Sequence, residues 1–461
     1  MEKLRADEIS RWVNGRLYGN KFAIADKVST DSRALTEGSL FVALRGEKFD
    51  GHQFIDEVLK KGASIVISEE EYPACESSAV IVVEDTVRAL GDLARNYIST
   101  FDLTVIGITG SVGKTTTKEM IAQVLSTQYN VHKTMGNFNN HIGLPLSVLS
   151  LNRDHEVAVF EMGMNALGEI DYLSKIIRPD IGVITNIGIS HIERLGSRQN
   201  ILRAKLEIIN GMKENGVLIL NGDDELLSGL EGLLPMPITF YGINEYCNIQ
   251  AYGIESLGEK GVRFTVNIRN SEVDIFLPVP GIHNVSDALA AVACGLELGI
   301  TNENIQKGLI EYSQEKMRLN IVDYGNVKVI NDAYNAAPSS TMAALAVLTE
   351  IAGSRRSIAV LGDMLELGEY SGEAHRSVGA RVASEKINYL VAIGELARDY
   401  VQGAIEAGMD KNYIYHFPDP ESAADFLKEL IEPNDVVLFK GSRGMHLDRV
   451  IENIFETTDG K

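Results

Sequence analysis

Leu103-Thr-Val-Ile-Gly-Ile-Thr-Gly110-Ser-Val-Gly113-Lys114-Thr115-Thr116 carries the strongest structural signal in the chain. Its first half is a short apolar run typical of a buried strand, and it leads into a helical stretch at 118–126. Glycines between a strand and a helix let backbone N–H groups converge on phosphate oxygens, and the helix N-terminus adds positive potential. The pattern G-x-x-x-x-G-K-[ST] requires glycine where this chain has Ile108, so the match is degenerate at its first position.

This segment predicts a phosphate-binding loop. Lys114 is placed to reach the β- and γ-phosphates of a nucleotide, and the Thr115 hydroxyl is placed to ligate Mg²⁺. The alternative is a glycine-rich turn with a solvated lysine. The predicted nucleotide-binding residues are Thr109, Gly110, Ser111, Val112, Gly113, Lys114, Thr115 and Thr116.

Further apolar runs follow at 155–163, 181–188 and 216–224, with helical stretches between them. Continuous apolar strands alternating with helices indicate a parallel sheet that is covered on both faces. Ligands bind beyond the carboxyl ends of such strands, so the polar residues that close each run are the candidates for function. These are Glu161, a candidate for holding a metal or its water, and Asn186 and His191 after the next strand. The alternatives are an ordinary strand-end carboxylate and a structural histidine.

The chain of 461 residues is long enough for about three domains. Changes in the pattern of apolar runs and helical stretches predict domains at 1–100, 101–315 and 316–461. Residues 249–280 read as a small antiparallel appendage, and strands at 328–334, 357–364, 388–394 and 435–442 are spaced for a doubly wound fold. We therefore expect an α/β protein in which a central P-loop parallel sheet is flanked by a small N-terminal α/β domain and a C-terminal Rossmann-like α/β domain.

Composition excludes several classes of function. The formal net charge is −21, which disfavours nucleic-acid wrapping and adsorption to anionic membranes. The three cysteines (Cys75, Cys247 and Cys294) form no C-x-x-C pair, and no apolar run approaches the roughly 18 residues of a membrane helix. The charged N-terminus lacks the apolar core of a signal peptide. We expect a cytoplasmic monomer that binds no nucleic acid and has no membrane span.

A phosphate loop does not specify a reaction. The Asn-Lys-x-Asp pattern of GTPases and the His-Arg-Asp set of protein kinases are absent from the chain. ATP-driven activation of a carboxylate is one possibility: the carboxylate takes the γ-phosphoryl group and an amine then displaces phosphate. Because the carboxylate and the γ-phosphate are both anions, that site needs Mg²⁺ and lysine to reduce the repulsion between them. A P-loop kinase acting on a small molecule and a nucleotide-binding regulatory module remain open.

Motifs along nearly the whole chain resemble those of the Mur ligase family, and within it the branch that adds a dipeptide. The segments that carry the resemblance are Ser29–Arg33, Phe41–Gly46, Asp50–His52, Thr109–Thr115, Asn137–Asn140, Glu161–Asn165, Thr185–His191, Ala204–Glu207, Gly281–Asn284, Lys316–Arg318, Asn331–Pro338, Leu361–Gly368 and Lys440–Arg443. The Asp-Asn-Pro-Arg motif of the diaminopimelate-adding relative is absent.

The resemblance implies an ATP-dependent amide ligase of peptidoglycan precursor synthesis. Such an enzyme joins D-alanyl-D-alanine to UDP-N-acetylmuramoyl-tripeptide through an acyl phosphate. It implies ATP and two Mg²⁺ ions as cofactors. A sibling that adds a single amino acid, or a folylpolyglutamate synthase, uses the same mechanism and remains an alternative.

The resemblance also implies roles for individual residues. Lys114, His191 and Lys205 would be catalytic, and Lys205 would be carbamylated by CO₂, whereas the alternative is a surface lysine. Thr115 would hold one Mg²⁺, and Glu161, His191 and the modified Lys205 the second. The further ATP-binding residues would be Asn284, Asp287, Arg318, Asp332 and Asn335. The substrate-binding residues would be Ser32, Arg33, Arg45, His52, Asn137, Asn140, Asn165, Asp363 and His375.

Two positions depart from the family pattern. The family usually has an asparagine where this chain has Asp287, and a carboxylate can only accept a hydrogen bond where an amide can also donate one. His141 stands where related ligases often carry an acid, which leaves its role open. Glu366 and Arg376 lie close in the sequence to the candidates Asp363 and His375. They are either part of the same site or ordinary charges on a helix surface.

Overall fold

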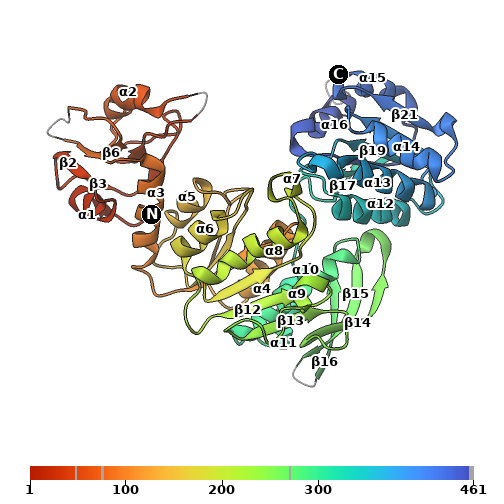
Figure 1. Ribbon diagram of the computed structural model, residues 1–461, viewed down its shortest axis with the longest axis horizontal. Coiled ribbons are helices and arrows are strands. Elements are labelled where there is room, and N and C mark those ends of the chain that lie inside the picture. Colours follow the sequence, from red (N-terminus) through yellow and green to blue (C-terminus); the bar gives the residue numbers. More distant parts are fainter. Residues whose placement is uncertain (47–48, 74–76, 269–270, 456–461) are drawn as a thin grey trace.

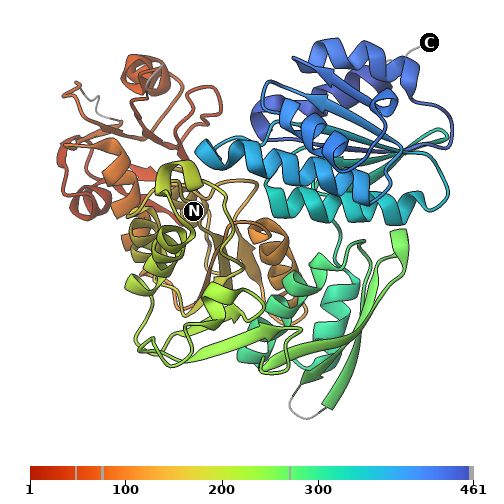
Figure 2. The same cartoon turned by 45° about the vertical axis from the view of Figure 1, so that its right-hand side comes forward.

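The computed structural model describes residues 1–46, 49–73, 77–268 and 271–455. The chain forms three α/β units, and in both views the N-terminal and C-terminal units lie above the central one (Figures 1 and 2). This is the three-part α/β architecture that the sequence predicts. Cys75 lies outside the described residues, and Cys247 and Cys294 are buried free thiols. Among the described helices, none combines the length and the apolar character that crossing a membrane requires.

The N-terminal unit is built on a five-stranded sheet with the order β2-β7-β6-β5-β4. All its pairs are parallel except β2 with β7, and a separate antiparallel pair joins β1 to β3. Its elements are β1 (Leu4–Arg5), α1 (Ala6–Trp12), β2 (Arg16–Gly19), β3 (Ile24–Ala25), β4 (Val28–Ser29), β5 (Leu40–Val42), η1 (Gly51–Phe54), α2 (Ile55–Lys60), β6 (Ile65–Ser68), β7 (Ala79–Val82) and α3 (Thr86–Ile98).

The central unit contains a nine-stranded sheet with the order β16-β15-β14-β13-β12-β11-β8-β10-β9. Strands β8 to β14 run parallel, and β14, β15 and β16 form an antiparallel meander. Its elements are β8 (Thr104–Thr109), α4 (Lys114–Leu125), β9 (Val131–Lys133), α5 (Gly143–Val148), β10 (Val157–Glu161), α6 (Glu169–Ile177), β11 (Ile181–Ile184), α7 (Ile192–Leu195), α8 (Arg198–Leu206), η2 (Glu207–Asn210), β12 (Val217–Asn221), α9 (Glu225–Ser228), β13 (Ile238–Gly242), β14 (Ile249–Ser256), η3 (Gly258–Lys260), β15 (Val262–Ile268), β16 (Ser271–Leu277), α10 (His283–Glu297) and α11 (Asn302–Ile310).

The antiparallel strands that the sequence predicts at 249–280 are present, and the structure shows where they join the central sheet. Strand β14 pairs in parallel with β13, at Tyr241 with Ile249 and at Gly242 with Gln250, so the meander extends the main sheet. The alternating pattern of these strands indicates that one face is buried. It does not indicate which strand of the sheet they pair with, because that pairing is made by backbone groups.

The C-terminal unit has a six-stranded sheet with the order β17-β18-β22-β19-β20-β21, in which only β17 runs antiparallel. The edge strands β17 and β21 lie outside the four strands predicted from apolar runs, because both are only half-buried. Its elements are β17 (Asn320–Tyr324), β18 (Val327–Asp332), α12 (Pro338–Ala352), β19 (Ser357–Gly362), η4 (Gly368–Tyr370), α13 (Ser371–Ser384), β20 (Tyr389–Ile393), α14 (Arg398–Glu406), η5 (Lys411–Tyr413), β21 (Ile414–Phe417), α15 (Pro420–Leu430), β22 (Val436–Lys440), η6 (Arg443–Met445) and α16 (Leu447–Phe455).

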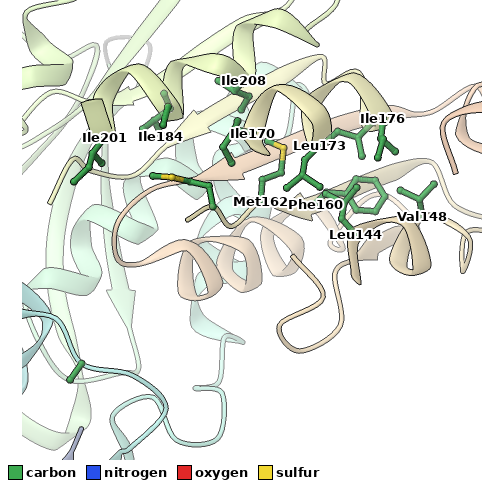
Figure 3. Close-up of a cluster of buried hydrophobic side chains, with 14 of the residues drawn as sticks. Leu144, Val148, Phe160, Met162, Ile170, Leu173, Ile176, Ile184, Ile201 and Ile208 are labelled. Carbon is green, nitrogen blue, oxygen red and sulfur yellow. The ribbon is translucent and has the colours of Figure 1, made fainter. Parts of the chain in front are cut away.

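A dry core holds the central sheet rigid. Phe160 and Met162 on and after β10 are fully buried, and Ile170, Leu173 and Ile176 of helix α6 pack in the same cluster (Figure 3). Helix α6 places these three residues on one face because they are spaced three apart. Burying each such side chain stabilises the fold by about 1.5–3 kcal/mol, which fixes the strand ends that carry polar residues.

The three units touch at defined points. Buried Tyr97 of α3 donates a hydrogen bond of 2.7 Å from its hydroxyl to the backbone oxygen of Leu151, which ties the N-terminal unit to the central one. The turn carrying α7 rises toward the C-terminal unit (Figure 1), where the Glu193 N–H donates to the Glu366 carbonyl at 3.3 Å. The carboxyl ends of β8, β10 and β11 therefore face a junction of units.

Candidate active site

The phosphate loop joins β8 to α4 and depends on two glycines. Gly113, the residue before the helix, has φ of 82°, in the left-handed region that favours glycine. Gly110 has φ of 155°, and a Cβ atom there would lie 1.8 Å from the Thr185 hydroxyl oxygen. Any larger residue at 110 would push the loop away from β11.

Backbone N–H groups of the loop divide into two sets. Ser111 donates its N–H to the Asn186 carbonyl at 3.1 Å, and Val112 donates its N–H to the Asn186 side-chain oxygen at 3.0 Å. The first N–H groups of α4, from Lys114 onward, have no acceptor within the helix. The groups available to an anion therefore lie at the helix N-terminus, after Val112.

The Lys114 ammonium curls back over the loop. It donates to the Gly110 carbonyl at 2.8 Å and lies 3.5 Å from the Ser111 carbonyl. Burial lowers the pKa of Lys114, the nearby Glu161 carboxylate opposes that shift, and Arg318 adds to it. The loop thus holds a cation directly above its own N–H groups.

Strand β10 delivers Glu161 to the start of α4. Its Oε2 accepts a hydrogen bond of 2.9 Å from the Thr115 hydroxyl, and its Oε1 accepts one of 2.8 Å from the Asn139 amide. The Glu161 N–H donates to the Thr134 hydroxyl at 3.1 Å. Thr115 and Glu161 are both buried, so two oxygen-bearing side chains meet at the carboxyl end of β10.

His191 and Lys205 lie on the same side of the sheet. His191 has φ of 62°, and its Nδ1 lies 2.5 Å from the Glu366 carboxylate of the C-terminal unit. Burial lowers the pKa of His191, while the Glu366 charge raises it and the Lys114 and Lys205 charges lower it. The histidine therefore links the central rim to the C-terminal unit.

Lys205 is a buried lysine on α8, with 1% of its surface exposed. Burial lowers its pKa well below the usual range, and repulsion from Lys114 adds to that shift. Within the described ranges, no residue pairs with its ammonium group. Burial and repulsion from Lys114 both disfavour the charged ammonium form of Lys205, and because this lysine is buried the surface alternative does not apply.

Arg318 brings the C-terminal unit to the phosphate loop. Its guanidinium donates to the Thr115 hydroxyl at 2.8 Å and stacks over the Tyr334 ring at 4.1 Å from the centroid. Nearby, Lys440 donates to the Asp332 carboxylate and to the Asn335 carbonyl at 3.0 Å. Asp332 also accepts the Leu319 N–H at 3.1 Å, which anchors the segment that carries Arg318.

Asn284 and Asp287 lie on α10, behind the loop. The Asn284 amide donates to the Pro280 carbonyl at 2.7 Å. Asp287 accepts a hydrogen bond of 2.7 Å from the Thr117 hydroxyl and abuts Gly113, where a Cβ atom would lie 2.7 Å from its Oδ1. Burial raises the pKa of Asp287 to about 7, against the Thr117 hydrogen bond and the Arg318 charge. Asp287 therefore supports the loop from beneath.

The N-terminal candidates pair with their own neighbours. Arg33 is exposed and bidentate to Asp31, at 2.9 and 2.8 Å. Ser32 is buried and accepts a hydrogen bond of 3.0 Å from Lys61 through its carbonyl.

Arg45 and His52 are held in the same local way. The Arg45 guanidinium contacts Asp50, Glu69 and Glu70 at 3.0, 3.1 and 2.8 Å. His52 is buried between the Asp50 carboxylate at 2.6 Å and the Glu69 N–H at 3.0 Å. Both side chains therefore already have partners within the unit.

The asparagine candidates of the central unit differ from one another. Asn140 accepts the N–H groups of Ile142 and Gly143 at 3.1 and 2.8 Å, so its side chain shapes the start of α5. Asn137 is exposed. The Asn165 N–H donates to Glu169 at 2.7 Å. His141 is exposed, and its role stays open.

Asp363 and His375 are buried inside the C-terminal unit. Asp363 accepts the Ala397 N–H at 2.8 Å, and burial raises its pKa. His375 accepts the Met364 N–H at 3.0 Å and lies 2.7 Å from the Ser371 carbonyl through Nδ1. Its ring is 4.6 Å from that of Tyr400, and burial lowers its pKa. These contacts shape the turn after β19. Arg376 pairs on the surface with Asp399 at 2.8 Å.

Sequence reasoning assigned no role to Asn139 or Lys440, and it gave Asn186 only as a candidate that follows a strand. Asn139 binds Glu161, Asn186 binds Val112 through its side chain, and Lys440 binds Asp332. Each was quoted within a motif, but only the tertiary contact separates it from its neighbours. The signal for Asn186 was its place at a strand end, beside β8.

Metal ligands from the protein are few. Within residues 1–46, 49–73, 77–268 and 271–455, no three His, Cys, Asp or Glu side chains gather into a metal-binding cluster. Mg²⁺ is ordinarily held by one or two carboxylates together with phosphate oxygens and water. Thr115 and Glu161 fit that donor set. The Thr109 hydroxyl is buried at the end of β8 with no hydrogen-bond partner among the described residues, which leaves a further oxygen unused.

Comparison with known proteins decides the family. Family models match at 25–98 (Mur ligase family, catalytic domain), 108–295 (Mur ligase middle domain) and 317–443 (Mur ligase, glutamate ligase domain). A UDP-N-acetylmuramoyl-tripeptide–D-alanyl-D-alanine ligase of Bacillus subtilis (strain 168) is 42% identical, covering 99% of each chain. The chain belongs to the Mur ligase family.

Solved structures agree with this Mur ligase along its length. A crystal structure of MurF from Acinetobacter baumannii superposes with a TM-score of 0.91 at 34% identity, covering 99% of each chain. MurF ligase from Thermotoga maritima, solved in complex with ADP, superposes with a TM-score of 0.81 at 31% identity, covering 93% of this chain and 97% of that one.

Proposed function

We propose that this Mur ligase joins D-alanyl-D-alanine to UDP-N-acetylmuramoyl-tripeptide with hydrolysis of ATP to ADP and phosphate, in peptidoglycan precursor synthesis. The observation that carries the proposal is the meeting of Lys114, Thr115, Glu161 and Arg318 at the carboxyl end of the central sheet. The printed names of full-length relatives support the choice of substrates. We also propose that it acts as a monomer in the cytoplasm.

The nucleotide phosphates would bind at the N-terminus of α4. N–H groups from Gly113 onward, the Lys114 ammonium and the Arg318 guanidinium surround that point and neutralise phosphate oxygens. Asp332 orders the segment that carries Arg318, and Asn335 lies beside it on the same Lys440 ammonium. Asn284 and Asp287 lie behind the loop and would bound the nucleotide from the α10 side.

Thr115 and Glu161 would hold one Mg²⁺, and Glu161, His191 and carbamylated Lys205 a second. Bound Mg²⁺ supplies charge neutralisation between anions. The buried, unpaired amine of Lys205 supports carbamylation, because a neutral amine can attack CO₂ and the product is a carboxylate. Carbamylation places a negative charge beside the Lys114 ammonium, where an ammonium group on Lys205 would be repelled.

The reaction would proceed in two steps. The terminal carboxylate of the tripeptide attacks the γ-phosphorus of ATP, which gives an acyl phosphate and ADP. The neutral amine of D-alanyl-D-alanine then attacks the acyl carbon, and the tetrahedral intermediate expels phosphate and loses a proton. Lys114 neutralises charge in the first step, where two anions approach.

We propose that residues 1–100 hold the UDP end of the substrate, 101–315 hold ATP, and 316–461 close over ATP and admit the dipeptide. Ser32, Arg33, Arg45 and His52 would serve the first role, and the arginines would exchange carboxylate partners for the diphosphate. Asn137, Asn140 and Asn165 would border the tripeptide. Asp363 and His375 would shape the dipeptide site through the turn after β19.

One assay tests the proposal. Phosphate release and product mass are measured with ATP, Mg²⁺, UDP-N-acetylmuramoyl-tripeptide and either D-alanyl-D-alanine or single amino acids. We expect phosphate release that depends on the dipeptide. The product should be heavier than UDP-N-acetylmuramoyl-tripeptide by the mass of one dipeptide less one water molecule. Release with single amino acids alone, a stable phosphorylated product, or no turnover would each contradict it.

A further inference from the structure

The segment that follows β11, residues 185–188, is bonded to the phosphate loop along its length. The Asn186 side chain makes two of these bonds: its oxygen accepts the Val112 N–H at 3.0 Å, and its amide donates to the Val112 carbonyl at 3.0 Å. The Thr185 hydroxyl donates to the same carbonyl at 2.6 Å. The Gly188 N–H donates to the Ser111 hydroxyl at 2.9 Å.

These bonds fix two consecutive peptide planes. The Val112 N–H belongs to the plane before Val112, and its carbonyl belongs to the plane shared with Gly113. In a trans peptide the C=O and N–H groups point in opposite directions. Because the Val112 carbonyl points at Asn186, the Gly113 N–H points away from β11.

The segment that holds the loop is itself held from its other side. The Ile187 N–H donates to the Asp224 carboxylate at 2.7 Å, and Arg198 donates to the Ile187 carbonyl at 3.0 Å. Asp224 follows β12 and caps α9 through the N–H of Leu226 at 3.0 Å. The segment 185–188 is therefore fixed between the phosphate loop and the next strand end.

We infer that Asn186 is a positioning residue for nucleotide phosphates: through Val112 it sets the direction of the Gly113 N–H. It needs no contact with the nucleotide, because its amide acts on the backbone. The inference rests on the proposed function, which places phosphates at the N-terminus of α4. It predicts that the amide contributes to binding of the phosphates and not of adenosine.

Asn186→Asp tests this inference with almost no change of shape. An ionised carboxylate keeps the acceptor for the Val112 N–H but sets an oxygen against the Val112 carbonyl, where the amide donated. The Asn186→Asp variant should bind ADP about 10- to 100-fold more weakly, as expected for a buried carbonyl that loses a donor and faces an anion. Calorimetric titration should show unchanged affinity for adenosine.

Two further variants sharpen the measurement. Thr185→Val removes the second donor to the Val112 carbonyl and should weaken ADP binding in the same direction, by less. Asn412→Asp, at an exposed position of the C-terminal unit, adds the same charge and should leave the affinity for ADP unchanged.

The outcomes separate this inference from the proposed function. Unchanged ADP affinity in Asn186→Asp, or an equal loss for ADP and adenosine together with a lower melting temperature, overturns the inference. Native protein that binds ADP but shows no dipeptide-dependent turnover contradicts the proposed function and leaves the inference standing.

Discussion

The rim of the central sheet and the N-terminal unit use similar charged residues in different ways. At the rim, Arg318 meets Thr115 across 203 positions of the chain, and Thr115 meets Glu161 across 46. In the N-terminal unit, Arg33 pairs with Asp31 two positions away, and Arg45 pairs with Asp50, Glu69 and Glu70, at most 25 positions away. These ion pairs are satisfied inside one unit, whereas the rim groups come from two units and converge on one point. The second arrangement is the one that can build a reaction site.

The largest effect is expected at the rim, for Lys114→Ala. Turnover should fall by about 1,000-fold or more, because the cation that lets two anions approach is lost. Phosphate release measures this. Lys175→Ala, which removes only an exposed ion pair with Asp171, is the matched control and should retain activity. An active Lys114→Ala variant would refute the role given to that lysine.

Lys205→Met should lower turnover by about 100-fold, because the variant has no amine to carbamylate. In ¹³C-bicarbonate, the native protein should show a carbamate carbon signal in NMR spectra, and Lys205→Met should lack it. A native spectrum without that signal would count against carbamylation, whatever the activity of the variant.

Arg318→Ala breaks the contact between the C-terminal unit and the phosphate loop. The KM for ATP should rise about 10- to 100-fold, as for loss of a charged hydrogen bond. Steady-state kinetics should show little change in the KM for the UDP substrate. Arg381→Ala, on the surface of α13, is the control. Equal KM values for ATP in both variants would show that the contact does not serve nucleotide binding.

Asp287→Asn tests the support beneath the loop. Native Asp287 keeps its proton to about pH 7, while the unfolded chain releases it near 3.8, so the folded state binds more protons between these values. The free energy of unfolding should therefore fall as pH rises from about 4 to about 7, by about 1.4 kcal/mol per pKa unit at most. The groups that face this carboxyl are Thr117, Arg318, Tyr241 and Tyr312.

In Asp287→Asn the free energy of unfolding should change less with pH. Above pH 7 the variant should be more stable than the native protein. Urea unfolding at pH 5 and pH 8 measures both. A variant that is less stable than the native protein at pH 8 would show that the carboxylate is a net stabilising anion in the folded state.

The smallest effect is expected for Arg45→Gln in the N-terminal unit. Its guanidinium already contacts three carboxylates, so binding a diphosphate would exchange one exposed ion pair for another. The KM for the UDP substrate should rise about fivefold at most. A rise of about 100-fold would erase the contrast between this unit and the rim.

The sequence predicted most of the fold because the buried strands are nearly continuous apolar runs. Strands β8, β10, β11 and β12 fall within the four runs of the central unit. The half-buried strands β17 and β21 gave no such signal, and the strand that the meander joins was not predicted, because pairing between β13 and β14 depends on backbone bonds. Periodicity reports burial, and burial is what these edge strands lack.

By itself, the sequence determined where the phosphate loop lies, since a strand, two glycines, a lysine and the start of a helix follow one another in a single segment, but contacts with Thr185 and Asn186 fix its peptide planes. It also determined that Glu161 would end a strand and that His191 would follow one. Only the tertiary structure decided which polar groups meet: Arg318 meets Thr115 and Asn186 meets Val112, while Lys205 has no partner among the residues that the structure describes. Those outcomes depend on the distance between atoms far apart in the chain and on their removal from water, and neither quantity is encoded in any single segment.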